Sequence, residues 1–216
     1  MNPKNQQVLI LGAGAIAKDI ADLVSEEDTY QVAGFIVDQP PFVRGSQITG
    51  KPIYWIDEVE DFSRECLVIC GLAKMKKISL INHFKEMGFQ FASFIHPSCR
   101  VSPSVQMGEG VIINSGVHIA IDAHIDEFIY INRGSLIGHD TSIGAYSVIS
   151  PGANIAGSVT IGTGCYIGMG AIITERVVIG KNCFVGAGSL VSQDLPDRVK
   201  VLGMPARIIE QNIQDF

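Results

Sequence analysis

The stretch VIINSGVHIAIDAHIDEFIYINRGSLIGHDTSIGAYSVIS, residues 111–150, repeats one pattern every six residues. A large aliphatic residue marks each repeat, and the same period extends in both directions, from Ile95 to Val191, without an insertion. The residue two positions earlier is uncharged and mostly small, so it also points inward. A helix needs a period of 3.6 residues and a flat strand a period of two, so neither fits. The repeat instead predicts a short strand followed by a corner.

The position after each aliphatic residue holds mainly Gly, Asn, Ser and Ala, which tolerate a tight corner. Three six-residue units close one triangular coil, so residues one coil apart stack at a strand spacing of about 4.8 Å. Ile113, Ile131, Ile149 and Ile167 are therefore predicted to form an internal ladder. The whole repeat predicts a prism of about five to six coils.

These columns, over residues 94–200, resemble the left-handed parallel β-helix of hexapeptide-repeat acyltransferases. The resemblance implies the handedness of the coil and a homotrimer. A homotrimer also agrees with the prism itself, because its flat faces cannot all be protected by one chain.

Residues 1–93 predict a separate small α/β domain with a parallel, Rossmann-like sheet. A strand leads into the turn Gly12-Ala13-Gly14-Ala15-Ile16-Ala17 and a helix that runs to Val24. The other expected elements are strands at 32–37 and 67–70, a helix at 78–87 and a last strand near 91–95.

The glycine turn leaves three interpretations open. Backbone N–H groups at the start of the helix could hold a phosphate, as in a dinucleotide fingerprint, and Asp38 lies at the distance expected of a ribose-binding acid. The turn could also be purely structural. An NAD(P) oxidoreductase would need a second mononucleotide-binding half, but the rest of the chain is committed to the β-helix.

The order of the two domains resembles the bacterial sugar O-/N-acyltransferases, which include sialic acid O-acetyltransferases and N-acetyltransferases for nucleotide-linked 4-amino-4,6-dideoxysugars. The resemblance implies that residues 1–93 bind a UDP- or GDP-linked aminosugar, that 94–200 carry out acyl transfer, and that 201–216 form a C-terminal tail. The implied substrate-binding residues are Gly14, Ala15, Ile16, Asp38 and Gly71. Many members of the family have His at the position of Ile16.

His139 is the candidate catalytic residue. It projects from a corner between Gly138 and Asp140, and the residue one coil later, Gly157, leaves space beside the imidazole. The same segment, together with Asn132 seven residues earlier, resembles the family segment in which the histidine is the general base. The resemblance implies that Asp140 strengthens this base and that Asn132 contacts the sugar. Imidazole suits the removal of a proton near neutral pH.

Metal chemistry is not expected. His118 and His124 are six residues apart and fall on adjacent faces of the prism, too divergent to share one ion. The five cysteines form no CxxC pair and are interpreted as reduced thiols.

The resemblance implies acetyl-CoA as co-substrate, held in the groove between neighbouring β-helices, with no permanently bound cofactor. Part of this site is the segment Gly203-Met204-Pro205-Ala206-Arg207, which matches a signature of the family. The implied acetyl-CoA-binding residues are Val148, Gly157, Met169, Ala187, Pro205 and Arg207. Some members carry a CoA-contacting His at the position of Val148.

The composition narrows the class of protein further. The chain has 216 residues, a net charge of -6 and no basic run longer than the stretch 74–77, so nucleic acid is not an expected partner. No apolar run is long enough for a membrane span, and residues 1–7 carry no signal-peptide pattern, so we expect a cytoplasmic protein.

The sequence therefore predicts an acetyl-CoA-dependent N-acetyltransferase of a nucleotide-linked 4-amino-4,6-dideoxysugar in surface-glycan biosynthesis. Two alternatives stay open: an O-acetyltransferase of a sialic-acid-like sugar and a non-catalytic β-helix scaffold. The sequence leaves open the nucleotide base, the sugar stereochemistry and the acyl chain length.

Overall fold

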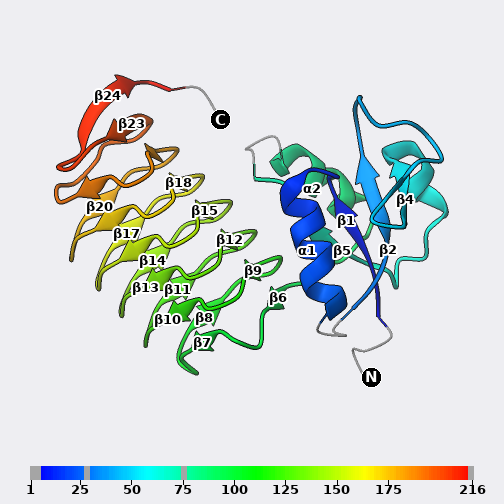
Figure 1. Ribbon diagram of the computed structural model, residues 1–216, viewed down its shortest axis with the longest axis horizontal. Coiled ribbons are helices and arrows are strands. Elements are labelled where there is room, and N and C mark those ends of the chain that lie inside the picture. Colours follow the sequence, from blue (N-terminus) through cyan, green and yellow to red (C-terminus); the bar gives the residue numbers. More distant parts are fainter. Residues whose placement is uncertain (1–5, 27–29, 74–76, 214–216) are drawn as a thin grey trace. The chain divides into compact units, whose positions relative to one another are not determined.

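The computed structural model describes residues 6–26, 30–73 and 77–213. The chain divides into two compact units, Met1–Ser93 and Phe94–Phe216 (Figure 1). Each unit has its own sheets and its own core.

The first unit is a five-stranded sheet in the order β3-β4-β2-β1-β5. Strands β4, β2, β1 and β5 are parallel to their neighbours, and the short β3 pairs antiparallel with β4. The strands are β1 (Gln7–Leu11), β2 (Gln31–Val37), β3 (Gln47–Ile48), β4 (Lys51–Trp55) and β5 (Leu67–Cys70). The helices are α1 (Ala15–Glu26), the 3-10 helix η2 (Ile56–Asp61) and α2 (Lys77–Glu86).

Two details of this sheet differ from the prediction. The expected last strand at 91–95 is split: Phe91 makes only an isolated bridge to Val68, whereas Phe94–Ile95 forms β6 and pairs with β9 (Ile112–Ile113) of the second unit. The sequence prediction also missed β4, whose segment KPIYW begins with a lysine and a proline. Both segments owe their pairing to the surrounding fold, because neither carries a strong strand pattern of its own.

The second unit is a prism of three sheets, formed by the parallel two-residue strands β6 to β22 (Figure 1). Two longer strands close it, and the last of them, β24, pairs antiparallel with β23. Sheet one contains β6 (Phe94–Ile95), β9 (Ile112–Ile113), β12 (Tyr130–Ile131), β15 (Val148–Ile149), β18 (Tyr166–Ile167), β21 (Phe184–Val185), β23 (Val199–Leu202) and β24 (Arg207–Gln211). Sheet two contains β7 (Arg100–Val101), β10 (His118–Ile119), β13 (Leu136–Ile137), β16 (Asn154–Ile155), β19 (Ile172–Ile173) and β22 (Leu190–Val191). Sheet three contains β8 (Gln106–Met107), β11 (His124–Ile125), β14 (Ser142–Ile143), β17 (Thr160–Ile161) and β20 (Val178–Ile179).

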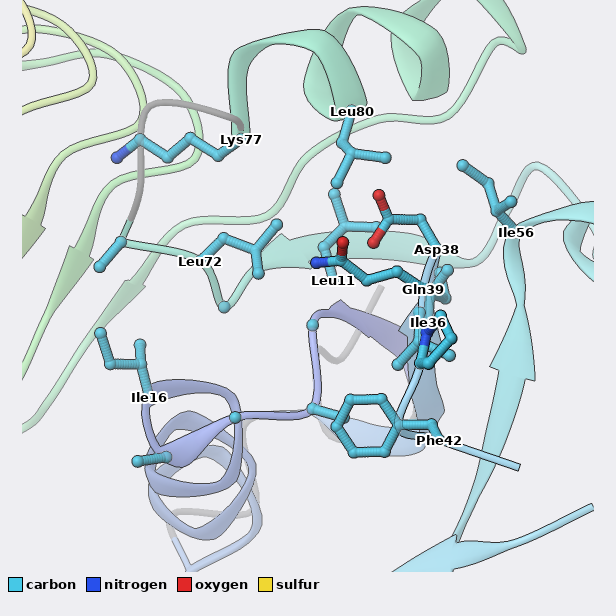
Figure 2. A pocket seen from close by; sticks show the side chains of 18 of the residues that line it. Leu11, Ile16, Ile36, Asp38, Gln39, Phe42, Ile56, Leu72, Lys77 and Leu80 are labelled. Atoms are coloured by element: carbon cyan, nitrogen blue, oxygen red, sulfur yellow. The ribbon is translucent and has the colours of Figure 1, made fainter. Parts of the chain in front are cut away.

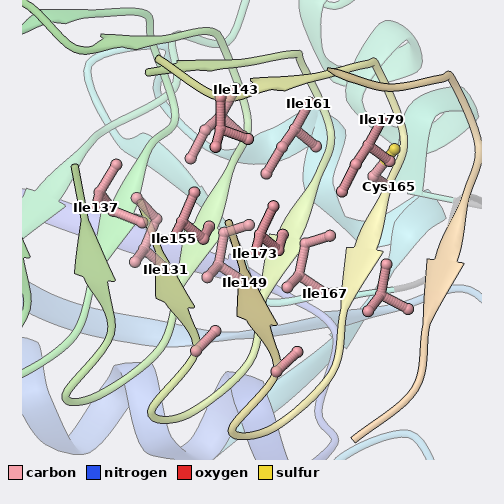
Figure 3. Packing of buried hydrophobic residues seen from close by; sticks show 14 of the residues in the cluster. Ile131, Ile137, Ile143, Ile149, Ile155, Ile161, Cys165, Ile167, Ile173 and Ile179 are labelled. Atoms are coloured by element: carbon pink, nitrogen blue, oxygen red, sulfur yellow. The ribbon is translucent and has the colours of Figure 1, made fainter. Parts of the chain in front are cut away.

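The stacking predicted from the six-residue period is confirmed. Ile113, Ile131, Ile149 and Ile167 pair in register along sheet one, and none of them is exposed to solvent. Figure 3 shows the corresponding rows of isoleucines from the three sheets meeting inside the prism. A core of this kind fixes the spacing between successive coils, and therefore the distance between corners that lie one coil apart. The candidate site depends on this spacing.

The corners differ from the prediction in one respect. From residue 110 to residue 188, the left-handed backbone conformation falls three positions after each aliphatic residue, not one. The glycine directly after the aliphatic residue is required for a different reason, because a Cβ at Gly138 would overlap the backbone of Ala156 in the next coil. Asp140, with φ of 55°, holds a left-handed position.

Candidate active site

His139 and Asp140 lie at the corner that joins β13 to β14. The left-handed backbone of Asp140, which Asp adopts more readily than most residues, turns its carboxylate toward the preceding side chain. His139 Nδ1 lies 2.7 Å from Asp140 Oδ2, and both side chains are more than half exposed. This bond fixes the ring orientation and leaves Nε2 as the nitrogen available for proton transfer.

Gly157 lies against the imidazole from the next coil. The backbone N–H of Ser158 donates to the carbonyl oxygen of His139 at 2.7 Å, so the two corners are tied together. A Cβ built on Gly157 would lie 2.5 Å from His139 Nε2. Glycine is therefore the residue that this ring position requires.

The backbone N–H of Gly157 is not capped by the side chain before it. At the corner after β12, the Oδ1 of Asn132 accepts from the N–H of Arg133 at 2.8 Å. Ala156 stands before Gly157 and offers no such acceptor. A donor that is not used in this way, next to a base, is suited to a developing negative charge.

The remaining residues proposed for the β-helix lie elsewhere on the prism. Asn132, Met169 and Ala187 occupy corners between sheets one and two, whereas His139 and Gly157 occupy corners between sheets two and three. One chain does not bring these two groups together. Val148 is 3% exposed and pairs between Tyr130 and Tyr166 on sheet one.

Pro205 and Arg207 lie where β23 turns back into β24. Both are exposed. Arg207 also lines a cavity of about 270 Å³, together with Ser192 and Asp194. The cavity thus offers a cation and several polar groups at the end of the prism.

A cavity of about 480 Å³ lies in the first unit, at the carboxyl ends of the parallel strands (Figure 2). All five residues proposed for this unit line it: Gly14, Ala15, Ile16, Asp38 and Gly71. The position agrees with the general placement of ligands in open parallel sheets.

Several residues of this cavity were missed by the sequence prediction. Most of them lie just after a strand or in the first turn of a helix, so the element boundaries are the signal that could have found them. They are Gln39, Phe42, Ile56, Leu72, Lys77 and Leu80. Of the basic stretch 74–77, only Lys77 belongs to the described residues, and it is 1% exposed.

Three further features concern clusters of metal-ligating side chains, long apolar helices and cysteines. No group of three or more His, Cys, Asp or Glu side chains there could hold a metal ion. Within the same residues, no helix has the length and apolar character needed to cross a membrane. Cys165 and Cys183 are buried in the prism, where their thiols donate to the carbonyl oxygens of Gly180 and Pro196.

Comparison with known families identifies the repeat. Residues 158–193 match the family described as bacterial transferase hexapeptide (six repeats), and residues 136–175 match the hexapeptide repeat of succinyl-transferase. No curated protein sequence matches the chain. The repeat places the chain in the hexapeptide-repeat acyltransferase superfamily.

Solved structures narrow this class further. A variant of the perosamine N-acetyltransferase from Caulobacter crescentus, bound to CoA and GDP-perosamine, is 32% identical, with a TM-score of 0.87 over 95% of this chain and 97% of that one. The acetyltransferase domain of PglB from Neisseria gonorrhoeae, in complex with acetyl coenzyme A, is 26% identical, with a TM-score of 0.87 over 95% and 100%. WeeI from Acinetobacter baumannii is 26% identical, with a TM-score of 0.88 over 94% and 100%.

The chain belongs to the nucleotide-aminosugar acyltransferases. Its fold class, a small α/β unit followed by a left-handed parallel β-helix, is confirmed as predicted.

Proposed function

We propose that the protein transfers the acetyl group of acetyl-CoA to the amine of a nucleotide-linked 4-amino-4,6-dideoxysugar. The observation that carries the proposal is the His139–Asp140 pair, held against Gly157 at a corner of a hexapeptide β-helix. The cavity of the first unit supplies a place for the nucleotide. The resemblance to a structure that binds CoA and GDP-perosamine supports both halves of the proposal.

The reaction follows from the geometry of His139. The sugar nitrogen attacks the thioester carbonyl carbon, and His139 Nε2 accepts the proton that the nitrogen loses. Asp140 holds the ring through Nδ1 and stabilises the imidazolium. The N–H of Gly157 is the donor that we assign to the oxyanion of the tetrahedral intermediate. When the C–S bond breaks, the proton passes from Nε2 to the CoA thiolate.

The nucleotide is assigned to the first unit because of the residues that line its cavity. The start of α1, at Ala15 and Ile16, presents backbone N–H groups that suit phosphate oxygens. Asp38 at the end of β2 suits the ribose hydroxyls, and the apolar lining suits a base. The amine of the sugar would be the group that His139 deprotonates, in a cytoplasmic enzyme of surface-glycan biosynthesis.

Acetyl-CoA is proposed to bind where two prisms meet. Met169, Ala187, Pro205 and Arg207 are the residues assigned to it on this chain, with Gly157 contributed from the other corner. Within one chain, these residues lie at two different kinds of corner. In a homotrimer with its sites between subunits, one corner of each kind would come from each of two neighbouring subunits.

Release of CoA tests the function directly. The assay is run with UDP- and GDP-linked 4-amino sugars and with free sialic acids as acceptors. Turnover with a nucleotide-linked amino sugar is expected. Turnover with free sialic acids alone would establish O-acetylation instead, and the absence of turnover with every acceptor would favour a scaffold.

Gly14→Asp should raise the KM for the nucleotide sugar by about tenfold or more, because it places an anion where phosphates are expected. Gly14→Ala is the matched control: a Cβ at this position meets nothing within 4 Å, so it should leave the KM almost unchanged. Steady-state kinetics with both substrates provide the measurement. A raised KM for acetyl-CoA with an unchanged KM for the sugar would reverse the assignment of the two units.

Subunit mixing tests the shared site. Light scattering should show a trimer, and co-expressing His139→Ala with Asn132→Ala subunits should restore activity at about a quarter of the sites, because random mixing reunites one intact corner of each kind. Each variant expressed alone serves as the control. A fully active monomer, or no recovery in the mixed trimers, would contradict a site between subunits.

A further inference from the structure

We propose that Thr141 is a positioning residue, which fixes the direction of the Gly157 N–H and strengthens it as the oxyanion donor of acetyl transfer. The proposal rests on the proposed function and deepens it. It gives a role to a buried hydroxyl that takes no other part in the reaction.

Thr141 follows the corner of His139 and Asp140, and its side chain points into the prism. It is 0% exposed and belongs to the inward row of sheet three, the residues that stand two positions before each aliphatic residue of that sheet. The other members of this row carry no hydroxyl; they are Val105, Ala123, Val159 and Val177. A hydroxyl is costly to bury among such residues unless it forms a hydrogen bond. In this row a hydroxyl is therefore buried only in the coil that carries His139.

The hydroxyl is bonded to the peptide group that precedes Gly157. Thr141 Oγ1 donates to the carbonyl oxygen of Ala156, in the next coil, at 3.0 Å. The carbonyl oxygen of His139 lies farther from this hydroxyl, at 3.5 Å, and already accepts the N–H of Ser158 at 2.7 Å. The bond to Ala156 is therefore the stronger of the two.

The carbonyl of Ala156 and the N–H of Gly157 belong to the same peptide group. This peptide is trans and planar, so its C=O and N–H point in opposite directions. Since Thr141 holds the carbonyl oxygen toward the interior of the prism, the N–H points outward, to the side on which the His139 ring is exposed. A hydrogen bond to the carbonyl also polarises the peptide and makes its N–H a stronger donor. Both effects favour an oxyanion beside the base.

A bond of the same kind occurs at a corner that has no His–Asp pair. Ser147 is also 0% exposed, and its Oγ donates to the carbonyl oxygen of Gly162, in the next coil, at 3.2 Å. Such a bond stabilises the stacking of coils wherever it occurs. Ser147 is therefore the matched control that separates this stabilising effect from an effect on the reaction.

The test compares Thr141→Val with Ser147→Ala by CoA release, with a nucleotide-linked 4-amino sugar as acceptor. Thr141→Val should fold, because valine holds the same place in the next coil, at Val159. Its kcat should fall about tenfold with both KM values within about twofold, since removal of a whole oxyanion donor costs about 10²–10³ and here the donor only loses its fixed direction. Thr141→Ser keeps the hydroxyl and should restore most of the rate. Ser147→Ala should leave kcat unchanged, although its unfolding temperature should fall at least as far as that of Thr141→Val.

The pH profile and a double variant distinguish the donor from the base. In Thr141→Val the acidic limb of the kcat/KM profile should stay in place, because His139 and Asp140 are unaltered. In the His139→Ala background, Thr141→Val should again lower the rate about tenfold, since the donor and the base act on different atoms of the substrates.

An unchanged kcat in Thr141→Val would overturn the role of Thr141 and leave the proposed function standing. An equal loss of kcat in Ser147→Ala, or no recovery in Thr141→Ser, would show that Thr141 only stabilises the fold. A shifted acidic limb, or a loss that disappears in the His139→Ala background, would show that Thr141 acts through the base. If the unchanged protein released no CoA with any acceptor, the proposed function would fall together with the role of Thr141.

Discussion

His139→Ala is expected to lower kcat by about 10²–10⁴, because the attacking amine must lose a proton and the base that accepts it is gone. The fold should survive, since the side chain is more than half exposed and takes no part in the isoleucine ladders. The measurement is the rate of CoA release at saturating concentrations of both substrates, with thermal unfolding followed in parallel.

His118→Ala is the matched control for this variant. His118 is another exposed histidine of the prism, at the start of β10 on sheet two, and its loss should leave kcat unchanged. Both variants should unfold close to the temperature of the unchanged protein, as exposed substitutions usually do. Near-normal turnover in His139→Ala would place the base elsewhere and refute the mechanism.

Gly157→Ala should cost about 10²-fold in kcat although it adds one methyl group, since small misplacements of a catalytic group carry penalties of this size. The new Cβ would lie 2.5 Å from His139 Nε2 and 2.7 Å from Cε1, so the ring must move. The backbone of Gly157 is not in the left-handed region, so alanine brings no strain of its own there. The purified variant should therefore fold and lose turnover.

A double-mutant cycle separates this positioning effect from a contact with acetyl-CoA. In the His139→Ala background, Gly157→Ala should cost little more, because the ring it displaces is already absent. An equal loss in both backgrounds would show that Gly157 acts independently of His139, through its own N–H or through acetyl-CoA. The KM for acetyl-CoA distinguishes these two cases.

The β-helix could be predicted almost completely because its core residues recur at a regular spacing in the sequence. Each inward position lies at a fixed distance in sequence from the next, so pairs such as Ile131 and Ile149 follow from counting. The corner conformation was placed two residues too early, because small residues serve two purposes. Gly138 is small to let the next coil approach, whereas the left-handed turn falls on Asp140.

The first unit was harder to predict because its pairings are not local. Strand β4 joins the sheet through β2, and its sequence KPIYW carries no clear alternation. Lys77 was missed for a similar reason: within a basic stretch it looks like a solvated lysine, and only the start of α2 places it against the cavity. In contrast, Gly14 and Asp38 followed from the strand–turn–helix order, which fixes their position at the edge of the sheet.

The left-handed corners bear on how such enzymes arise. Gly, Asn and Asp tolerate this conformation best, and the corners at Gly152, Asn182 and Asp122 already hold these three residues. A change from asparagine to aspartate at a corner thus adds an acid without disturbing the backbone. The pair at His139 and Asp140 stands on such a corner, so natural selection could gain or lose the carboxylate beside the proposed base in a single step while the scaffold stayed intact.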